Sequence, residues 1–428
     1  MNKKRKTYSE EVSERQIELP NSVIYRIVRA VFHFVAISWG TKFYYHFDEK
    51  QLKGKQVILL ADHAAFDSYI YTLAGYKFTN LNFVVGFHHA FNKIIYGVGR
   101  KIGFIPKRNF EVDLKAVRHM VQVIQKGGSL CIFPEGTFSF SGANHAVNPS
   151  TINFIKQLGV TVVLCRSHGA YCSRPTFKSH STFGHREIDY EILFTSEQLK
   201  QLSNEEIDKK LFDSIKYNDV EWARENKHPY RWPITKMKGI DTFLYTCPNC
   251  GKQYVMDVTG RNLVCRECGN VVHINRYYQT RVRGKNVCPY VDIVDWYNDE
   301  RRKVKKEIED PNFSISYDCD LYSIHTDKAR FKPNYIAGEG NITISHKGIR
   351  YVGTRDGKQV DLLFDIKLIP CFKYDVKRQN ILNYHNEYFC FRPKKEKEKT
   401  IKYMMIVEEI HNLHDDIWRK AYEDAYGK

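Results

Sequence analysis

The sequence lacks an apolar run long enough to cross a membrane. Its longest candidate, Val23 to Trp39, is interrupted by Arg26, Arg29 and His33, whereas a spanning helix needs about 20 mostly apolar residues. The basic start, Met1 to Lys6, is not followed by the apolar segment of a secretory signal either. We therefore expect a protein that neither spans a membrane nor is secreted.

The sequence also lacks the cysteine pattern of a disulfide framework. It has eleven cysteines in 428 residues, of which four form one cluster and the others are scattered. Scattered thiols fit a reducing compartment better than a set of paired disulfides. We expect the protein to work in such a compartment.

Acidic residues are too few to balance the basic ones. The chain has 49 Asp and Glu against 66 Lys and Arg, which gives a net charge of +17. This excess suggests an anionic partner, namely nucleic acid, an anionic membrane or a phosphorylated small molecule, although it can also serve solubility alone. The length of the chain predicts two or three domains.

The interrupted apolar segment reads as an amphipathic helix. Arg26, Arg29 and His33 recur on one face, and the apolar residues cover the other: Ile24, Ile27, Val28, Val31, Phe34 and Val35. Helices of this kind lie in a membrane interface, where flanking aromatic residues are also common. Soluble proteins equally pack such helices on a core. The sequence favours neither alternative.

Two CxxC pairs lie fourteen residues apart in the middle of the chain: Cys247, Cys250, Cys265 and Cys268. Four thiolates at this spacing predict a tetrahedral zinc site. Gly251 and Gly269 follow the two pairs and permit tight turns. Four protein ligands leave no open position, so the zinc is expected to be structural, and we expect no redox cofactor.

Short apolar strands alternate with helical segments in the first half of the chain. The strands are expected at 56–61, 82–86, 129–133 and 161–165, and the alternating segment 188–194 is typical of an edge strand. This order predicts an α/β domain with a mixed sheet flanked by helices. We place it at 21–238, after a charged tail at 1–20.

The second half of the chain predicts smaller units. A zinc ribbon at 239–278 and a charged linker at 279–312 precede a mostly β domain at 313–428. Its strands are expected at 342–344, 349–352, 360–366, 371–374, 388–391 and 400–405, with a closing helix at 407–422. Strands closed by one helix resemble the pleckstrin-homology and GRAM-like architecture.

Three polar motifs follow apolar strands. His63 and Asp67 follow the strand at 56–61, Gly103 to Arg108 comes next, and Phe133 to Thr137 ends the strand at 129–133. Open α/β sheets place ligand chemistry at such strand ends. In this order the blocks resemble the glycerolipid acyltransferase family, of the lysophosphatidic acid acyltransferase type, over about two fifths of the chain. Val160 to Val163 stands where the family has its fourth block.

The resemblance implies a catalytic pair. Acyl transfer from a thioester to an alcohol needs a base for the hydroxyl proton, and the pKa of histidine suits that task. His63 would be the base, and Asp67 would orient the imidazole and stabilise its charged form.

The resemblance also implies an acceptor site. Arg108 would bind the acceptor phosphate with help from Lys107, because guanidinium groups match phosphate geometry. Glu135, Gly136 and Thr137 would line the glycerol and phosphate end, and backbone groups near Gly136 would stabilise the oxyanion.

The sequence departs from the family in two places. Three residues separate His63 from Asp67, where the family has four, so the position that matches the family is Ser68. If the segment is helical, the spacing of four puts His63 and Asp67 on one face and keeps the pair plausible. Phe138 stands where the family commonly has a basic residue, which leaves the acceptor headgroup open.

These observations predict a membrane-associated acyltransferase, peripheral or monotopic on the cytoplasmic face. Acyl-CoA or acyl-carrier protein would be the donor, and 1-acylglycerol 3-phosphate the acceptor. The alternative is a lipid-binding scaffold of the same fold whose ribbon and β domain recruit partners. The charges of the ribbon are partly balanced, which disfavours nucleic acid as the partner.

Overall fold

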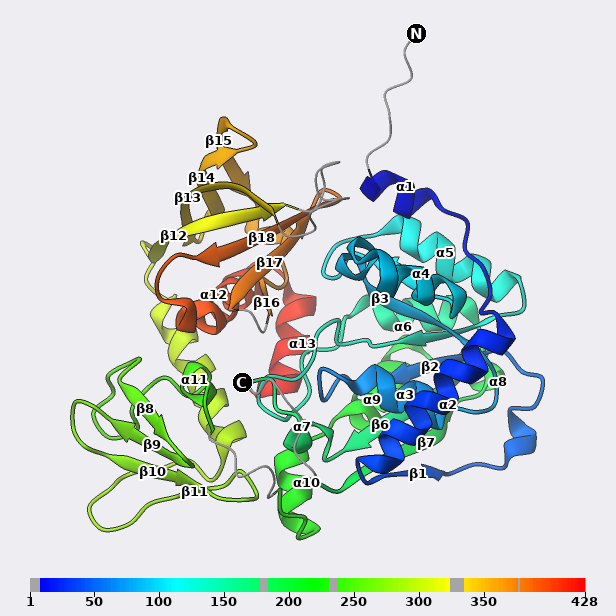
Figure 1. Cartoon of the computed structure of the whole chain (residues 1–428), viewed down its shortest axis with the longest axis horizontal. Helices are drawn as coiled ribbons and strands as arrows, with labels where there is room; N and C mark the ends of the chain where they lie inside the picture. Colours follow the sequence, from blue (N-terminus) through cyan, green and yellow to red (C-terminus); the bar gives the residue numbers. More distant parts are fainter. Residues whose placement is uncertain (1–7, 178–183, 231–236, 324–334, 376–377, 428) are drawn as a thin grey trace. The chain divides into compact units, whose positions relative to one another are not determined.

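The computed structural model describes residues 8–177, 184–230, 237–323, 335–375 and 378–427, and Figure 1 labels their helices and strands. The chain forms two compact units. The first consists of Met1–Arg26, Asn80–Ile132 and Val304–Arg419, and the second of Ile27–Thr79, Phe133–Lys303 and Lys420–Lys428. Both units are therefore built from segments that lie far apart in the sequence.

The second unit contains a mixed four-stranded array, as expected from the sequence. Its order is β1 (Thr41–Tyr45), β7 (Arg186–Phe194), β6 (Thr161–His168) and β2 (Val57–Ala61). β1 is parallel to β7 and β2 is parallel to β6, whereas β6 and β7 are antiparallel. All five residues of β2 are buried, which explains its continuous apolar run.

β7 is not the edge strand that its alternating pattern predicted. It pairs with β6 on one side and with β1 on the other. The expectation was wrong because β1 has mixed exposure and few aliphatic residues, so its sequence gave no strand signal. Polar residues on the exposed face of β7 keep the alternation of a half-buried strand.

The helices of the second unit include the amphipathic helix expected at 23–39. They are α2 (Ser22–Ser38, which begins in the first unit), α3 (Ser68–Gly75), α6 (Ser150–Leu158), α7 (Ala170–Ser173), α8 (Ser196–Gln201), α9 (Asn204–Ile215) and α10 (Asp219–Glu225). None of the helices among the described residues combines the length and apolar character needed to cross a membrane.

The first unit contains three parallel strands from residues 81–132. β3 (Leu81–Gly86) lies between β5 (Ser129–Ile132) and β4 (Ile105–Lys107). The accompanying helices are α1 (Tyr8–Glu14), η2 (Phe87–Phe91), α4 (Lys93–Lys101) and α5 (Leu114–Gln125). Asp113 caps α5, since its side chain accepts a hydrogen bond from the Ala116 N–H at 3.0 Å.

The C-terminal part of the first unit is a separate antiparallel sheet, which confirms the expected mostly β region. Its strands in order are β15 (Lys358–Phe364), β14 (Gly348–Arg355), β13 (Tyr335–Ser345), β12 (Ser314–Ser323), β18 (Glu387–Pro393), β17 (Gln379–Tyr384) and β16 (Lys373–Asp375). The likeness to pleckstrin-homology domains stays a prediction.

Two helices follow this sheet where one was expected. α12 (Thr400–Asn412) and α13 (Asp416–Tyr426) replace the predicted strand at 400–405 and the single helix at 407–422. Every residue of α12 is buried. A helix that is covered all round shows no amphipathic period, so its first turn was misread as a strand.

The middle of the chain forms a small four-stranded antiparallel sheet in the second unit. Its order is β11 (Thr280–Arg281), β10 (Val271–Ile274), β9 (Asn262–Cys265) and β8 (Met256–Thr259). The helix α11 (Ile293–Glu307) follows. Its Glu300 accepts hydrogen bonds from the Thr246 N–H at 2.8 Å, the Thr246 hydroxyl at 2.5 Å and the Trp296 indole at 3.1 Å.

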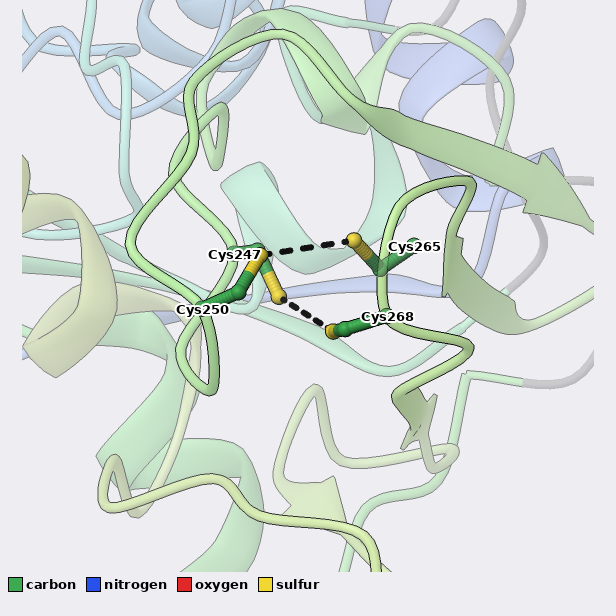
Figure 2. A group of neighbouring side chains, drawn as sticks. All are labelled: Cys247, Cys250, Cys265 and Cys268. Carbon is green, nitrogen blue, oxygen red and sulfur yellow. Dashed lines mark hydrogen bonds between the residues drawn. The ribbon is translucent and has the colours of Figure 1, made fainter.

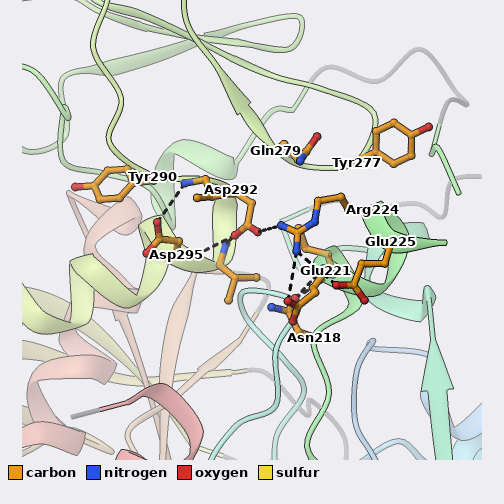
Figure 3. Close-up of polar contacts among 12 residues, drawn as sticks. Asn218, Glu221, Arg224, Glu225, Tyr277, Gln279, Tyr290, Asp292 and Asp295 are labelled. Carbon is orange, nitrogen blue, oxygen red and sulfur yellow. Dashed lines mark hydrogen bonds and ion pairs between the residues drawn. The ribbon is translucent and has the colours of Figure 1, made fainter. Parts of the chain in front are cut away.

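Polar contacts join this small sheet to α10 within the second unit. Arg224 of α10 lies 3.3 Å from Glu221 and 3.8 Å from Asp292, which precedes α11 (Figure 3). The Val291 N–H donates to Asp295 at 3.2 Å. These contacts involve residues of the segment expected to be a charged linker at 279–312, and its assignment as a linker stays a prediction.

Candidate functional site

His63 lies in the turn after β2, and both its backbone and its ring make contacts there. Its N–H donates to Glu135 Oε1 at 2.9 Å, and its carbonyl accepts from the Ser139 N–H at 2.9 Å. Its Nδ1 lies 3.1 Å from the Ala65 carbonyl, and its ring packs on Phe133 with centroids 4.8 Å apart. In the tautomer that donates from Nδ1 to this carbonyl, Nε2 keeps a lone pair that can accept a proton.

Asp67 is fully buried beside α3, and two side chains hold its Oδ2. The Tyr71 hydroxyl donates to it at 2.9 Å and the guanidinium of Arg174 at 3.1 Å. Oδ1 is buried and has no hydrogen-bond partner in the described part of the chain. The negative charge is therefore compensated by Arg174, while one carboxylate oxygen remains available.

The helical argument for the His63–Asp67 pair does not apply. α3 begins only at Ser68, so the two side chains do not share a helical face. Ser68, the alternative position, closes the turn: its Oγ accepts from the Ala65 N–H at 3.0 Å and donates to the Ala65 carbonyl at 2.8 Å. A catalytic pairing of His63 with Asp67 stays a prediction.

Glu135 is buried and joins two loops. Its Oε1 accepts from the His63 N–H at 2.9 Å, and its Oε2 accepts from the His145 N–H at 2.6 Å and the Tyr217 hydroxyl at 3.4 Å. Burial raises the pKa of Glu135 to about 8, and the two backbone N–H groups oppose that rise. These contacts make Glu135 a positioning residue for the turn that carries His63.

Gly136 and Thr137 complete the turn after β5. Gly136 has a φ of 68°, a conformation that favours glycine, and its N–H lies 3.1 Å from the Phe133 carbonyl. Thr137 is fully buried, and its hydroxyl has no hydrogen-bond partner among the residues described. Phe138, the departure from the family pattern, packs edge-on against Phe66 at 6.0 Å.

Sequence reasoning missed the residues that support these groups. Arg174 reaches Asp67 from the segment after α7, and its guanidinium lies 5.3 Å from the Phe66 ring centroid. His145 and Tyr217 reach Glu135 from loops. None of these residues belongs to a sequence motif. Only Arg174 could have been suspected as a site residue, because it follows the strand β6.

Lys107 and Arg108 lie at the end of β4 in the first unit. The guanidinium of Arg108 contacts Asp113 at 3.4 Å, Ser13 Oγ at 3.2 Å and the Asn386 carbonyl at 3.1 Å. It also lies 4.0 Å from the Phe87 ring centroid, and the side chain is only 3% exposed. Arg108 can therefore reach a phosphate only by exchanging one of these contacts.

A hairpin of the C-terminal sheet covers this segment. Its turn between β17 and β18 donates from the Asn386 N–H to Glu111 at 2.7 Å, and Asn383 donates to the Asn109 carbonyl at 2.9 Å. Burial lowers the pKa of Lys107, against the opposing effect of Asp113 and Glu111. The predicted phosphate-binding pair and the C-terminal sheet are thus parts of one packed unit.

The four patterned cysteines converge from two turns, as Figure 2 shows. Their sulfurs all lie within 4.8 Å of one another, with 3.7 Å between Cys247 and Cys268 and 3.8 Å between Cys250 and Cys265. A tetrahedral zinc with bonds of about 2.3 Å places its sulfurs roughly 3.8 Å apart. The cluster therefore has the chemistry and the spacing that a zinc ion requires.

Glycines close both cysteine turns. Gly251 and Gly269 have φ values of 73° and 71°, which a side chain would disfavour. Their N–H groups donate to the carbonyls of Cys247 at 2.9 Å and Cys265 at 3.1 Å. Each turn thereby aims its two sulfurs at the same point.

Comparison with known proteins finds a family match for one part of the chain. Residues 42–167 match the family model described as Acyltransferase. None of the curated proteins compared with the chain matches it. Among solved structures, the chain is similar to the 1-acyl-sn-glycerophosphate (LPA) acyltransferase PlsC from Thermotoga maritima, with 17% identity and a TM-score of 0.35, over 46% of this chain and 80% of that chain.

Proposed function

Because the chain belongs to the acyltransferase family through residues 42–167, we propose that it transfers a fatty acyl group to a lysophospholipid. The donor is acyl-CoA or acyl-carrier protein. The acceptor is 1-acylglycerol 3-phosphate, and the product is phosphatidic acid. The observation that carries this proposal is the fixed position of His63 within the matched segment.

His63 is the proposed base. Its Nε2 takes the proton from the acceptor hydroxyl while the hydroxyl oxygen attacks the thioester carbonyl. The carbon–oxygen bond forms, the carbon–sulfur bond breaks, and the proton passes to the leaving thiolate. The bonds from His63 to Glu135 and Ser139 support this role because they fix the turn before a substrate binds.

Asp67 is proposed to stabilise the imidazolium through its free Oδ1. A change in the side-chain torsion of His63 would be needed to form that bond, since Nδ1 now lies beside Ala65. Arg174 would weaken this stabilisation of the imidazolium, because its guanidinium already compensates the negative charge of Asp67.

Lys107 and Arg108 are the proposed ligands of the acceptor phosphate. Bidentate guanidinium–phosphate bonds are strong enough to replace single bonds to Ser13 and the Asn386 carbonyl. Glu135, Gly136 and Thr137 are proposed to shape the acceptor end, with the unpaired Thr137 hydroxyl available for a polar group of the glycerol.

Membrane association is proposed through α2. Its inner face is buried at Tyr25 and Ala36, whereas Ile27 and Phe34 on the outer face are 59% and 76% exposed. The exposed apolar residues recur at helical spacing: Val23, Ile27, Val31, Phe34 and Ile37. This stripe supports a helix that lies on an anionic membrane at the cytoplasmic face, peripheral or monotopic.

We further propose that the Cys247 cluster binds a structural zinc ion and that residues 239–278 form a zinc ribbon. The sulfur separations of 3.7 and 3.8 Å support this assignment. The site would use all four positions of the ion, so zinc would stabilise the fold without acting on a substrate.

A non-catalytic scaffold is the second candidate function. The engaged guanidinium of Arg108 and the unexpected Phe138 favour it, since both weaken an acceptor phosphate site. In that case the chain would bind lysophospholipid without turnover.

Acyl transfer by the purified protein separates the two candidates. Labelled acyl-CoA and acyl-carrier protein are offered with a panel of lysophospholipids in vesicles, beside His63→Ala and the exposed control His414→Ala. We expect transfer that falls about 10²–10⁴-fold in His63→Ala and is unchanged in the control. Activity that survives in His63→Ala would exclude the proposed base, and lipid binding without turnover by the parent protein would favour the scaffold.

A further inference from the structure

Two histidines and a glutamate outside the acyltransferase motifs come together in the second unit. His185 directly precedes β7, Glu187 is the second residue of that strand, and His228 follows α10. Residues two apart in an extended segment point to the same side. The side chains of His185 and Glu187 therefore face the loop that brings in His228.

The potential ligand atoms of these residues are close. All three side chains offer a nitrogen or oxygen within 4.8 Å of the others. His185 Nε2 lies 2.6 Å from a Glu187 carboxylate oxygen, and the rings of His185 and His228 stack with centroids 4.0 Å apart. His185 and Glu187 are 22% and 26% exposed, so dissolved ions can reach the group.

Neighbouring contacts hold the group in place. Trp222 packs on both histidines, with centroids 6.1 Å from His185 and 5.2 Å from His228. The Tyr230 hydroxyl donates to the His185 carbonyl at 2.6 Å, and the His228 N–H donates to the Ala223 carbonyl at 2.9 Å. Such support limits the entropy that a ligand must remove on binding.

We propose that His185, Glu187 and His228 form a second metal site, which binds a divalent transition ion such as Zn²⁺. Two imidazoles and one carboxylate are a ligand set that zinc uses, and three protein ligands leave the fourth position to water. Ligand atoms around such an ion lie roughly 3.3 Å apart, so the stacked rings of His185 and His228 must turn out of their present packing to direct both lone pairs at one ion.

The donor atoms of the group select the kind of ion. Lys42 on β1 is the register partner of Glu187 on β7, and its positive charge disfavours all cations alike. Calcium and magnesium need several oxygen ligands, which this group does not supply. Imidazole nitrogen favours zinc and its neighbours in the transition series.

This site is separate from the cysteine cluster and independent of the proposed acyl transfer. Its ion would join the start of β7 to the segment after α10. The contact between His185 and Glu187 would be exchanged for bonds to the ion, and because only neutral imidazole binds a metal, binding would weaken at acidic pH.

Metal content tests the proposal in the full chain prepared without a polyhistidine tag. After removal of metal and incubation with Zn²⁺, we expect about two equivalents per chain, one of them from the cysteines. The double variant His185→Ala, His228→Ala should keep one equivalent, and His414→Ala should keep both. One equivalent in the parent protein, or two in the double variant, would overturn the proposal.

Cobalt titration and a conservative variant guard against misfolding. Cobalt bound by thiolates absorbs strongly through charge transfer, so an unchanged thiolate band in the double variant would show that the cysteine site is still folded. Glu187→Gln keeps the shape of the side chain and should weaken the second zinc about 10-fold or more in competition with a chromophoric chelator. Equal affinity in Glu187→Gln and the parent protein would contradict the assigned ligand.

Discussion

The carboxyl group of Glu135 accepts a backbone hydrogen bond on each oxygen, from His63 and from His145. At a pH above 8, where the carboxyl group is ionised, Glu135→Gln replaces an accepting oxygen by an NH₂ donor against one of these two N–H donors. We expect a loss of about 1–3 kcal/mol in unfolding free energy and reduced acyl transfer, because the His63 turn loses a fixed contact. Denaturant unfolding and initial rates measure both effects.

The exposed residue Glu197 on α8 provides the matched control for this change. Glu197→Gln removes a charge from the first turn of α8 and should lower the unfolding free energy less than Glu135→Gln does, without an effect on the rate. Equal behaviour of the Glu135 and Glu197 variants would mean that the Glu135 contacts contribute nothing measurable.

A second residue prediction concerns pH. Asp219 is buried and accepts from the Tyr171 N–H at 2.7 Å, and burial raises its pKa from 3.8 to about 7. Between these values the folded state holds a proton that the unfolded state has released. The stability that Asp219 contributes is therefore complete below about pH 4 and is lost as the pH rises toward 7.

Asp219→Asn removes this titration while keeping an acceptor for Tyr171. We expect the slope of unfolding free energy against pH between 4 and 7 to become less negative, by at most about 1.4 kcal/mol per pH unit. Asp213→Asn, on an exposed position of α9, should leave the slope unchanged. A slope that Asp219→Asn does not alter would show that Asp219 is ionised in the folded protein.

Residues in sequence motifs could be located in advance, whereas their supporting partners could not. The cysteine spacing predicted a cluster that the structure contains, because two short turns suffice to build it. Arg174 and His145 reach Asp67 and Glu135 from positions 107 and 10 residues away. Those contacts depend on tertiary packing, which no local pattern encodes.

At the scale of elements, α2 has one packed face and one exposed apolar face, and its contact with a membrane stays a prediction. One face packs on the core at Tyr25 and Ala36, and the opposite face leaves Phe34 exposed. Phe34→Glu should weaken binding to anionic vesicles by about 10-fold or more, since it removes an exposed aromatic group that would enter the lipid and adds charge repulsion. The unfolding midpoint should stay constant. Vesicle co-sedimentation and thermal unfolding test both expectations.

Gln201→Glu on α8 adds the same charge at an exposed position of another helix. Vesicle binding should change little in this control. Equal losses in the two variants would point to net charge, and not to the stripe on α2, as the cause.

Hydrophobic patterns predicted the continuous apolar strands, but they failed for a helix that is buried on all sides and for a strand of mixed exposure. The apolar strands β2 and β6 lie where the sequence placed them. α12 was missed because all of its residues are buried, including Lys402, which pairs with Glu307. β1 was missed because a strand of mixed exposure carries no clear period.

At the scale of the whole molecule, the first unit depends on the C-terminal third of the chain. Its core packs Phe87 and Phe91 against Ile381 and Tyr388. A chain that ends at Lys303 would expose these aromatic residues. We expect it to aggregate or to unfold without cooperativity, as measured by gel filtration and thermal unfolding.

Co-expression of residues 304–428 with this truncated chain should restore solubility, because it returns the missing side of the core. A truncated chain that remains monomeric and unfolds cooperatively would show that the acyltransferase segment needs no contribution from the C-terminal sheet.

The segmented composition of the first unit also bears on how the protein is made. Residues up to Ile132 leave the ribosome 172 residues before Val304, where their packing partners begin (304 − 132). At about 5–20 residues per second, this delay lasts roughly 9–34 seconds. During that interval Phe87 and Phe91 have no completed core to enter. Nascent chains of this protein should therefore depend on chaperones until synthesis is almost finished.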